Sequence, residues 1–253
     1  MLSTQTLEKL SALRLDGMVQ ALEEQRRQPD ITGLDFEARL GLLVERQWSW
    51  KENRSLSRRL KLAQLKISAS LEDVDYRHPR GLKRDQIEQL RASRWIAEHR
   101  NCLITGPTGA GKTYLACALG HAACRDGQRT VYYYAPKLFR ALQAAQADGS
   151  FLPLLKKLTR APLLIIDDLG IANVVGKQYR DLLEILDDRQ GQGATLITSQ
   201  FPVHQWHEII ADATVADAIL DRLVHNAYRI ELKGESLRKH NGVSSSNPTP
   251  SDQ

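Results

Sequence analysis

Two short stretches of the sequence contain residue types that could act on a phosphate group. GPTGAGKT, at residues 106–113, has three glycines and ends in a lysine and a threonine. APLLIIDDLG, at residues 161–170, is an aliphatic run followed by Asp167 and Asp168. Adjacent carboxylates at the end of a buried strand are costly without a positive partner. The sequence therefore predicts a cation close to these two acids.

The glycine-rich stretch matches the phosphate-binding pattern G-x-x-x-x-G-K-[ST] at every fixed position. Its glycines allow backbone N–H groups to point at phosphate oxygens, and the following helix adds its positive N-terminal end. Lys112 is predicted to reach the β- and γ-phosphates of ATP, and Thr113 to ligate Mg²⁺. A glycine-rich turn with an exposed lysine is the alternative, which the strand before it and the helix after it disfavour. The predicted nucleotide-binding residues of this stretch are Gly106, Pro107, Thr108, Gly109, Ala110, Gly111, Lys112, Thr113 and Tyr114.

This phosphate site accounts for the two acids. We expect the strand at 163–168 to lie beside the strand that precedes the phosphate loop, so that Mg²⁺ bound to the triphosphate is the positive partner. Asp167 is then the metal-holding acid, together with Thr113. Asp168 is predicted to orient or deprotonate the attacking water. A helix N-cap after a buried strand is the alternative interpretation of the pair.

Further polar residues fall where a hydrolase would use them. Thr198, Ser199 and Gln200 end a predicted strand, and Ser199 is the favoured sensor of the γ-phosphate. Arg222 is a candidate arginine finger for the nucleotide of a neighbouring subunit, which requires oligomerisation. Arg238 is a second candidate for contact with the γ-phosphate. Ordinary surface arginines are the alternative for both.

The order of elements predicts an α/β domain that carries these residues. Apolar strands alternate with amphipathic helices, which is typical of a mainly parallel sheet. The predicted strands are 101–105, 130–134, 163–168, 194–199 and 227–232. The predicted domains are a helical N-terminal domain at 1–75, the α/β domain at 76–242 and a disordered, proline-bearing tail at 243–253.

The N-terminal domain is predicted to be all-helical. One helix carries leucines at helical spacing and ends near residues 26–30, and a second begins after Asp35, a good N-cap. The length of the second helix indicates a break. Its basic residues have spacings that suit binding to phosphate backbones. The predicted DNA contacts are Arg46, Lys51, Arg54, Arg58, Arg59, Lys61 and Lys66. A solvated face, with Trp48 and Trp50 packed on the α/β domain, is the alternative.

The composition limits the remaining possibilities. The chain has a formal net charge of +5, which is compatible with a polyanionic partner. Its three cysteines are sparse and lack metal-ligand spacing, as in a reducing cytoplasm. A membrane span and a secretory signal are not predicted. Guanine specificity is not expected, because no N-K-x-D pattern follows the phosphate loop.

Taken together, these motifs resemble the IstB-like transposition helper ATPases, a branch of the AAA+ superfamily close to the DnaC helicase loader. The resemblance rests on TLEKLSALRLDGMVQALEEQ, DYRHPRGL, GPTGAGKTYLA, ADGSFLPLLKKLTRAPLLIIDDLG and ILDRLVHNAYRIELKGESLR. It implies an AAA+ ATPase that assembles on duplex DNA, selects target DNA and recruits or stimulates a partner transposase. It also implies that Arg222 is the finger and Arg238 a sensor arginine. A helicase loader that binds single-stranded DNA is the second reading, and a DNA-binding scaffold without ATP turnover is a third.

The sequence departs from the superfamily at the second acid. AAA+ proteins commonly have Asp-Glu where this chain has Asp167 and Asp168. Aspartate is one methylene shorter than glutamate, so the attacking water would sit differently and hydrolysis is expected to be slow.

Overall fold

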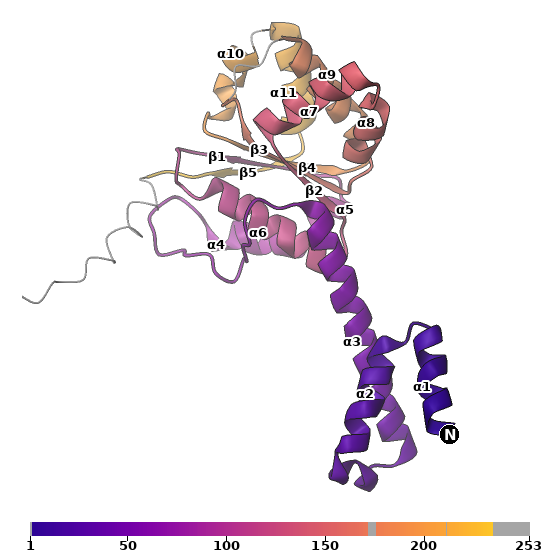
Figure 1. The fold of residues 1–253 in the computed structure, drawn as a ribbon. Coiled ribbons are helices and arrows are strands. Elements are labelled where there is room, and N and C mark those ends of the chain that lie inside the picture. Colours follow the sequence, from indigo (N-terminus) through magenta and orange to yellow (C-terminus); the bar gives the residue numbers. More distant parts are fainter. Residues whose placement is uncertain (1, 172–175, 211, 235–253) are drawn as a thin grey trace, which may run out of the picture. The chain divides into compact units, whose positions relative to one another are not determined.

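The computed structural model describes residues 2–171, 176–210 and 212–234 (Figure 1). Its contacts divide the chain into two compact units, Met1–Arg58 and Arg59–Gln253. The boundary falls inside helix α3 (Phe36–Ala63). Residues 59–75 therefore belong to the second unit, whereas the sequence had assigned them to the N-terminal domain. The tail predicted at 243–253 lies outside the described residues.

The first unit is helical, as the sequence predicted. It contains α1 (Leu2–Ala12), α2 (Asp16–Arg27), the 3-10 turn η1 (Pro29–Gly33) and the first part of α3. The single first helix of the prediction is wrong, because Arg14 has a left-handed φ of 59° and separates α1 from α2. The predicted N-cap is confirmed: Asp35 Oδ1 accepts a 2.7 Å hydrogen bond from the nitrogen of Ala38. α3 continues for 28 residues without the expected break.

α2 and α3 pack closely as an antiparallel pair within this unit. The Met18 nitrogen donates to Gln47 Oε1 at 3.1 Å, and Gln25 Nε2 donates to the carbonyl of Arg39 at 3.0 Å. A Cβ on Gly17 would lie 2.8 Å from the Cα of Gln47. Gly17 therefore allows a backbone approach that a side chain would prevent.

The second unit is built on a parallel sheet of five strands in the order β2-β3-β4-β1-β5. The strands are β1 (Asn101–Thr105), β2 (Thr130–Tyr134), β3 (Leu163–Leu169), β4 (Ala194–Ser199) and β5 (Ala227–Glu231). All five strands were predicted. Their order was not predicted. β4 lies between β1, which precedes the phosphate loop, and β3, which carries the two acids. The expectation that these two strands are neighbours is wrong.

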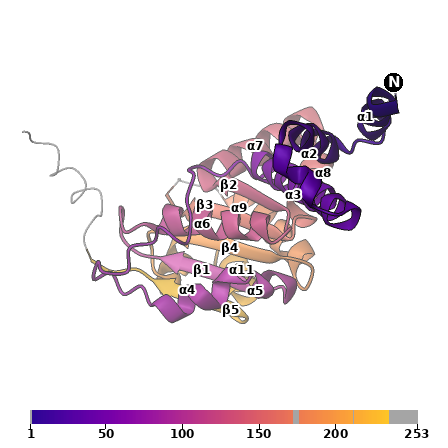
Figure 2. The ribbon, with the colours of Figure 1, turned by 90° about the horizontal axis from the view of Figure 1, so that it is seen from below.

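Helices cover both faces of this sheet (Figures 1 and 2). One face carries α4 (Arg84–Arg91), α5 (Arg94–Ala97) and α6 (Lys112–Arg125), whose apolar side chains form one buried cluster. The other face carries a second cluster from the remaining helices. These are α7 (Ala135–Asp148), α8 (Phe151–Thr159), α9 (Gly176–Arg189), α10 (Trp206–Ile210) after the 3-10 turn η2 (Val203–Gln205), and α11 (Ala213–Val224). The sequence did not predict α4, α5 or α8.

Both faces of the sheet are thus buried, which explains the long aliphatic strands. Leu163, Leu164, Ile165 and Ile166 are completely buried in β3. Among the described residues, no helix is long and apolar enough to cross a membrane.

Candidate nucleotide-binding site

The phosphate loop lies between β1 and α6, as predicted. Gly106, Gly109 and Gly111 have φ values of 145°, 85° and 95°, which side-chain-bearing residues rarely adopt. A Cβ on Gly106 would also collide with the carbonyl oxygen of Leu232, just beyond β5. The loop therefore requires glycine for its conformation and, at residue 106, for space. Thr108, Gly109, Gly111, Lys112, Thr113 and Tyr114 line a pocket of about 450 Å³, while Ala110 is buried beneath it.

The lysine of the loop is held close to the backbone. Lys112 is 5% exposed, and its Nζ donates to the carbonyl oxygens of Gly106 and Pro107 at 2.8 and 2.9 Å. Burial lowers the pKa of Lys112, and the charges of Asp168 and Asp167 oppose that shift. These contacts place a cation at the start of α6, where a phosphate group would bind.

Asp167 is the centre of a buried polar cluster. Its side chain is completely buried, and Thr113 Oγ1 lies 3.0 Å from each of its carboxylate oxygens. The hydroxyls of Tyr132 and Thr198 donate to the same carboxylate, each at 2.7 Å. Burial, followed by the charge of Asp167, raises the pKa of Tyr132, so this hydroxyl remains a donor. Tyr132 was not predicted to take part in the site, and Thr198 was named as a candidate at the end of its strand, although Ser199 was favoured.

Asp168 lies at an irregularity in the strand. The pairing of β3 with β4 shifts between Ile166 and Leu169, and Asp168 has a left-handed φ of 61°. Aspartate is among the residues that tolerate this conformation. Bulges of this kind re-aim side chains next to active sites. Here Asp167 is buried in the cluster, whereas Asp168 lines the pocket, so the two neighbouring acids occupy different environments.

The end of β4 differs from the sequence prediction. Ser199 is completely buried, and its hydroxyl donates to the carbonyl of Leu169 at 2.7 Å and accepts from the nitrogen of Phe201 at 3.2 Å. Thr198, by contrast, binds Asp167 and accepts from the backbone nitrogen of Asp168 at 2.8 Å. The structure therefore brings Thr198, and not Ser199, to the acids, while the neighbouring Gln200 lines the pocket.

A segment that joins α3 to α4, residues 64–83 and here called the strap, forms another wall of the pocket. Its pocket-lining residues are Lys66, Ile67, Asp73, Asp75 and Arg80. Arg80 is 3% exposed and donates to the carbonyls of Ala110 and Asp75 at 3.0 and 3.1 Å. Burial lowers its pKa. The strap therefore forms part of the wall of the pocket that the phosphate loop also lines.

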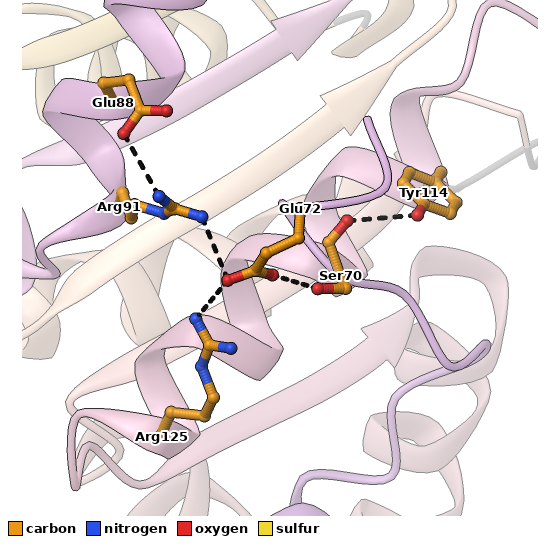
Figure 3. Close-up of polar contacts among 6 residues, drawn as sticks. All are labelled: Ser70, Glu72, Glu88, Arg91, Tyr114 and Arg125. Atoms are coloured by element: carbon orange, nitrogen blue, oxygen red, sulfur yellow. Dashed lines mark hydrogen bonds and ion pairs between the residues drawn. The ribbon is translucent and has the colours of Figure 1, made fainter. Parts of the chain in front are cut away.

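Glu72 fastens the strap to α4 and α6 (Figure 3). Its carboxylate pairs with Arg91 at 3.0 Å and with Arg125 at 2.8 Å, and it accepts a hydrogen bond from the Ser70 hydroxyl. The hydrogen bonds from Ser70 and Arg125 lower the pKa of Glu72 to about 2. Tyr114, next to the phosphate loop, donates to the carbonyl of Ser70 at 3.1 Å.

Two of the residues predicted to contact DNA, Lys66 and Arg59, make contacts within the second unit. α3 ends at Ala63, so Lys66 is not on the basic helix, and its Nζ lies 3.7 Å from Asp167 Oδ2. The DNA contact of Lys66 stays a prediction, and the structure adds its contact with Asp167. Arg59 Nε donates to the carbonyl of Cys124 at 2.7 Å.

The other basic residues are exposed on α3. Arg46 pairs with Glu24 at 2.5 Å. Helical geometry places four of the seven on one stripe, at positions i, i+3, i+7 and i+10. These are Lys51, Arg54, Arg58 and Lys61. Arg54 lies 3.7 Å from Asp16 and 4.9 Å from the ring centroid of Trp50.

The two tryptophans of α3 differ in their surroundings within the first unit. Trp50 approaches Gly17, and Trp48 is 66% exposed. Packing of either tryptophan on the α/β domain stays a prediction.

Arg222 lies near the N-terminal end of β1, whereas the phosphate loop follows the C-terminal end of that strand. Asn101, the first residue of β1, donates to the carbonyl of Arg222 at 2.9 Å, whereas the loop follows the last residue of that strand. The Arg222 side chain pairs with Asp187 and donates to the carbonyl of Ala218 at 3.0 Å. It does not line its own nucleotide pocket. Arg238 lies outside the described residues.

Known proteins are similar to this chain over nearly its whole length. The sequence model of the family described as "IstB-like ATP binding protein" matches residues 8–245. A protein of Sinorhizobium fredii named as an insertion sequence ATP-binding protein is 49% identical over 240 residues, covering 95% of this chain and 98% of that one. The corresponding protein of insertion sequence IS21 from Pseudomonas aeruginosa is 29% identical over 248 residues, or 96% and 92% of the two chains.

Solved structures show the same fold in the second unit. The structure of DnaI matches with a TM-score of 0.54 and 28% identity, over 65% of this chain and 90% of that one. The DnaC helicase loader matches with a TM-score of 0.52 and 21% identity, over 65% and 97%. The second unit therefore has an AAA+ P-loop fold, and over nearly its whole length the chain belongs to the family of IstB-like ATP-binding proteins.

Proposed function

We propose that the protein is an ATP-hydrolysing transposition helper that oligomerises on duplex DNA. It selects target DNA and recruits or stimulates its partner transposase, and hydrolysis drives disassembly. One observation carries the enzymatic part of this proposal: the phosphate-loop Thr113 touches the buried Asp167 while Asp168 lines the same pocket. The insertion-sequence names of the relatives support the transposition context.

The residues present fit Mg²⁺ bound together with ATP. The Thr113 hydroxyl and the Asp167 carboxylate are the hard oxygen donors that this ion prefers. The Lys66 ammonium already lies 3.7 Å from that carboxylate, so the cluster accepts a cation. Among the described residues no group of three or more His, Cys, Asp or Glu could hold a metal, so phosphates and water would complete the ligand set. Mg²⁺ would neutralise charge on the β- and γ-phosphates.

The side chains of the pocket take distinct roles in this proposal. Lys112 and the N-terminal end of α6 bind the phosphates. Asp168, held by the bulge in β3, orients or deprotonates the attacking water. Thr198 takes the sensor role that the sequence favoured for Ser199, because its hydroxyl donates to the Asp167 carboxylate and accepts from the backbone nitrogen of Asp168.

Arg222 is proposed to act on the nucleotide of a neighbouring subunit. Arg222 lies at the opposite end of the strands from the nucleotide pocket of its own subunit and does not line that pocket, which suits action on a neighbouring subunit. Arg238 is proposed to contact the γ-phosphate, as the family resemblance of the stretch ILDRLVHNAYRIELKGESLR implies.

DNA is proposed to bind to the stripe on α3. Lys51, Arg54, Arg58 and Lys61 lie on one side of a regular helix and are all exposed. Contacts of this kind go to the phosphate backbone and carry little sequence information. The partly packed Trp50 holds Arg54 on this stripe.

ATP-dependent co-sedimentation with long duplex DNA tests the proposal. Wild-type protein is expected to pellet with duplex DNA only when ATP is present, and Lys112→Ala is expected to stay in the supernatant. Preference for single-stranded DNA of equal mass would identify a helicase loader instead. Pelleting that is indifferent to both ATP and Lys112 would contradict a nucleotide-gated assembly.

Phosphate release measured in parallel tests the hydrolytic part. Turnover that is raised by duplex DNA is the expected result. Tight ATP binding without any phosphate release, with or without DNA, would identify a scaffold that binds ATP and does not hydrolyse it.

A further inference from the structure

The buried carboxylate of Asp167 has one cation at ion-pair distance among the residues that the structure describes. Its hydrogen bonds come from the neutral hydroxyls of Thr113, Tyr132 and Thr198. The cation is Lys66, whose Nζ lies 3.7 Å from Oδ2. The ammonium of Lys112 turns instead to backbone carbonyl oxygens of its own loop. A buried carboxylate without a cation is strongly disfavoured, so this contact compensates its charge.

The fold delivers Lys66 to this position in a defined way. α3 ends at Ala63, and Gln64 has a left-handed φ of 53°, so the chain leaves the helix axis just before the lysine. Leu65 then packs against the apolar cluster on the α6 face. The Lys66 ammonium lies 5.0 Å from the ring centroid of Tyr134, which pairs with Asp167 across β2 and β3.

Lys66 and a metal ion would compete for the same oxygen atoms. Thr113 and Asp167 are the proposed ligands of Mg²⁺, and the ammonium already lies beside one oxygen of that carboxylate. An ammonium group and a Mg²⁺ ion that contact the same carboxylate would lie close together and repel each other. The Lys66 side chain is 46% exposed and can swing away, whereas Asp167 is fixed by three hydroxyl donors and is fully buried.

We propose that Lys66 is the exchangeable counter-cation of Asp167: it neutralises this carboxylate in the metal-free protein and leaves it when ATP and Mg²⁺ bind. This inference rests on the nucleotide site proposed above. Because Lys66 follows the end of α3 by three residues, loading of the metal releases one attachment of the strap immediately after that helix. Occupancy of the ATP site thereby changes the position of one side chain, Lys66, at the start of the strap.

The experiment compares Lys66→Met, which keeps the unbranched stem and removes the charge, with Lys66→Arg, which keeps the charge. Binding of a fluorescent non-hydrolysable ATP analogue is measured at increasing Mg²⁺ concentration. Lys66→Met is expected to lower the Mg²⁺ midpoint on the order of tenfold, because the competing charge is gone. Lys66→Arg should remain within about twofold of wild type, since a charge of the same sign is retained.

Thermal unfolding supplies a second readout that is independent of activity. In EDTA, Lys66→Met is expected to melt at a lower temperature than wild type, because Asp167 has lost its cation. Adding the ATP analogue with Mg²⁺ should remove this difference in melting temperature. Lys137→Met is the matched control, since Lys137 is an exposed lysine in α7 that does not line the pocket. It should match wild type in both assays.

The outcomes separate this inference from the proposed function. An unchanged or higher Mg²⁺ midpoint in Lys66→Met would overturn the exchange of cations while leaving the nucleotide site intact. Failure of the wild-type protein itself to bind the analogue with Mg²⁺ would instead overturn the proposed function. An equal melting temperature of wild type and Lys66→Met in EDTA would also contradict charge compensation by Lys66.

Discussion

Thr198 donates a 2.7 Å hydrogen bond to Asp167 from the neighbouring strand, and its oxygen also accepts from the backbone nitrogen of Asp168. One hydroxyl thereby fixes the first acid and the backbone of the second. This contact is possible because β4 lies between β1 and β3, which places a side chain of β4 beside both acids.

Replacing Thr198 by valine is expected to impair hydrolysis more than ATP binding. The variant keeps the shape of the side chain but removes one of the three hydroxyl donors to Asp167 and the acceptor of the Asp168 backbone nitrogen. We expect kcat to fall about tenfold or more, with KM changed much less. Ser199→Ala is the matched control. It should keep kcat but lose about 1 kcal/mol of stability, because the Ser199 hydroxyl bridges Leu169 and Phe201. A larger kcat loss in Ser199→Ala would restore the sensor role to that residue.

Asp168→Asn is expected to abolish turnover while ATP binding is retained. Asparagine tolerates the left-handed φ of this position, so the backbone should be preserved while the base is lost. We expect a fall in kcat of about 100-fold or more in steady-state phosphate release. Asp168→Glu tests whether the short acid keeps hydrolysis slow: the rate should rise if one methylene limits the position of the water. A rate unchanged by Asp168→Glu would exclude that explanation.

The trans action of Arg222 predicts complementation between two inactive variants. Lys112→Ala supplies an intact Arg222 but no functional phosphate site, and Arg222→Ala supplies the reverse. Each alone should lack DNA-stimulated hydrolysis, and a mixture should regain a fraction of it, because mixed neighbours form complete sites. The measurement is phosphate release across mixing ratios at constant total protein. A mixture no more active than its components would place Arg222 outside the chemistry.

The α3 stripe predicts a change in the salt dependence of DNA binding. The triple variant Lys51→Ala, Arg58→Ala, Lys61→Ala should bind duplex DNA more weakly at every sequence tested. The slope of log K against log salt should become shallower by about 3, roughly one for each lost phosphate contact. Lys137→Ala with Lys156→Ala, two exposed lysines elsewhere, is the control and should leave the slope unchanged. A triple variant with the wild-type slope would exclude this stripe as the DNA site.

The Glu72 cluster predicts a pH-dependent contribution to stability. The pKa of Glu72 in the folded protein is lowered from 4.5 to about 2, so ionised Glu72 favours the folded state above its ordinary pKa. That contribution is lost as the pH falls through this window. The melting temperature of wild type should therefore exceed that of Glu72→Gln at neutral pH, and the difference should narrow between about pH 4.5 and about pH 2. A difference that is constant with pH would show that the charge of Glu72 is not responsible.

Local patterns predicted the strands and the phosphate loop because their signals are contained in a few consecutive residues. The aliphatic run of β3 and the glycines after β1 belong to this class. The order of the strands could not be predicted in the same way, because it depends on crossovers between distant segments. This error affected the site prediction: because β4 was not expected beside β3, there was no reason to prefer Thr198 over Ser199.

The roles of Tyr132 and Lys66 show a different limit. Three consecutive tyrosines, residues 132–134, end β2 near the acids, but the sequence does not identify which hydroxyl reaches Asp167. The residue paired with Asp167 is Tyr134, whereas the hydroxyl that bonds to it belongs to Tyr132, two residues earlier on the same strand. The sequence predicted Lys66 to belong to the basic helix, because no proline or glycine marks the end of that helix at Ala63. A residue in a left-handed conformation, Gln64, ends α3 without any compositional signal.

The close approach of Gly106 and Leu232 has a practical consequence for protein engineering. The carbonyl oxygen of Leu232, one residue beyond β5, lies where a Cβ on Gly106 would have to fit. A Gly106→Ala variant would therefore displace the backbone of Leu232 as well as distort the phosphate loop. Such a variant reports on both segments together, whereas Lys112→Ala leaves both backbones in place and reports on the loop lysine alone.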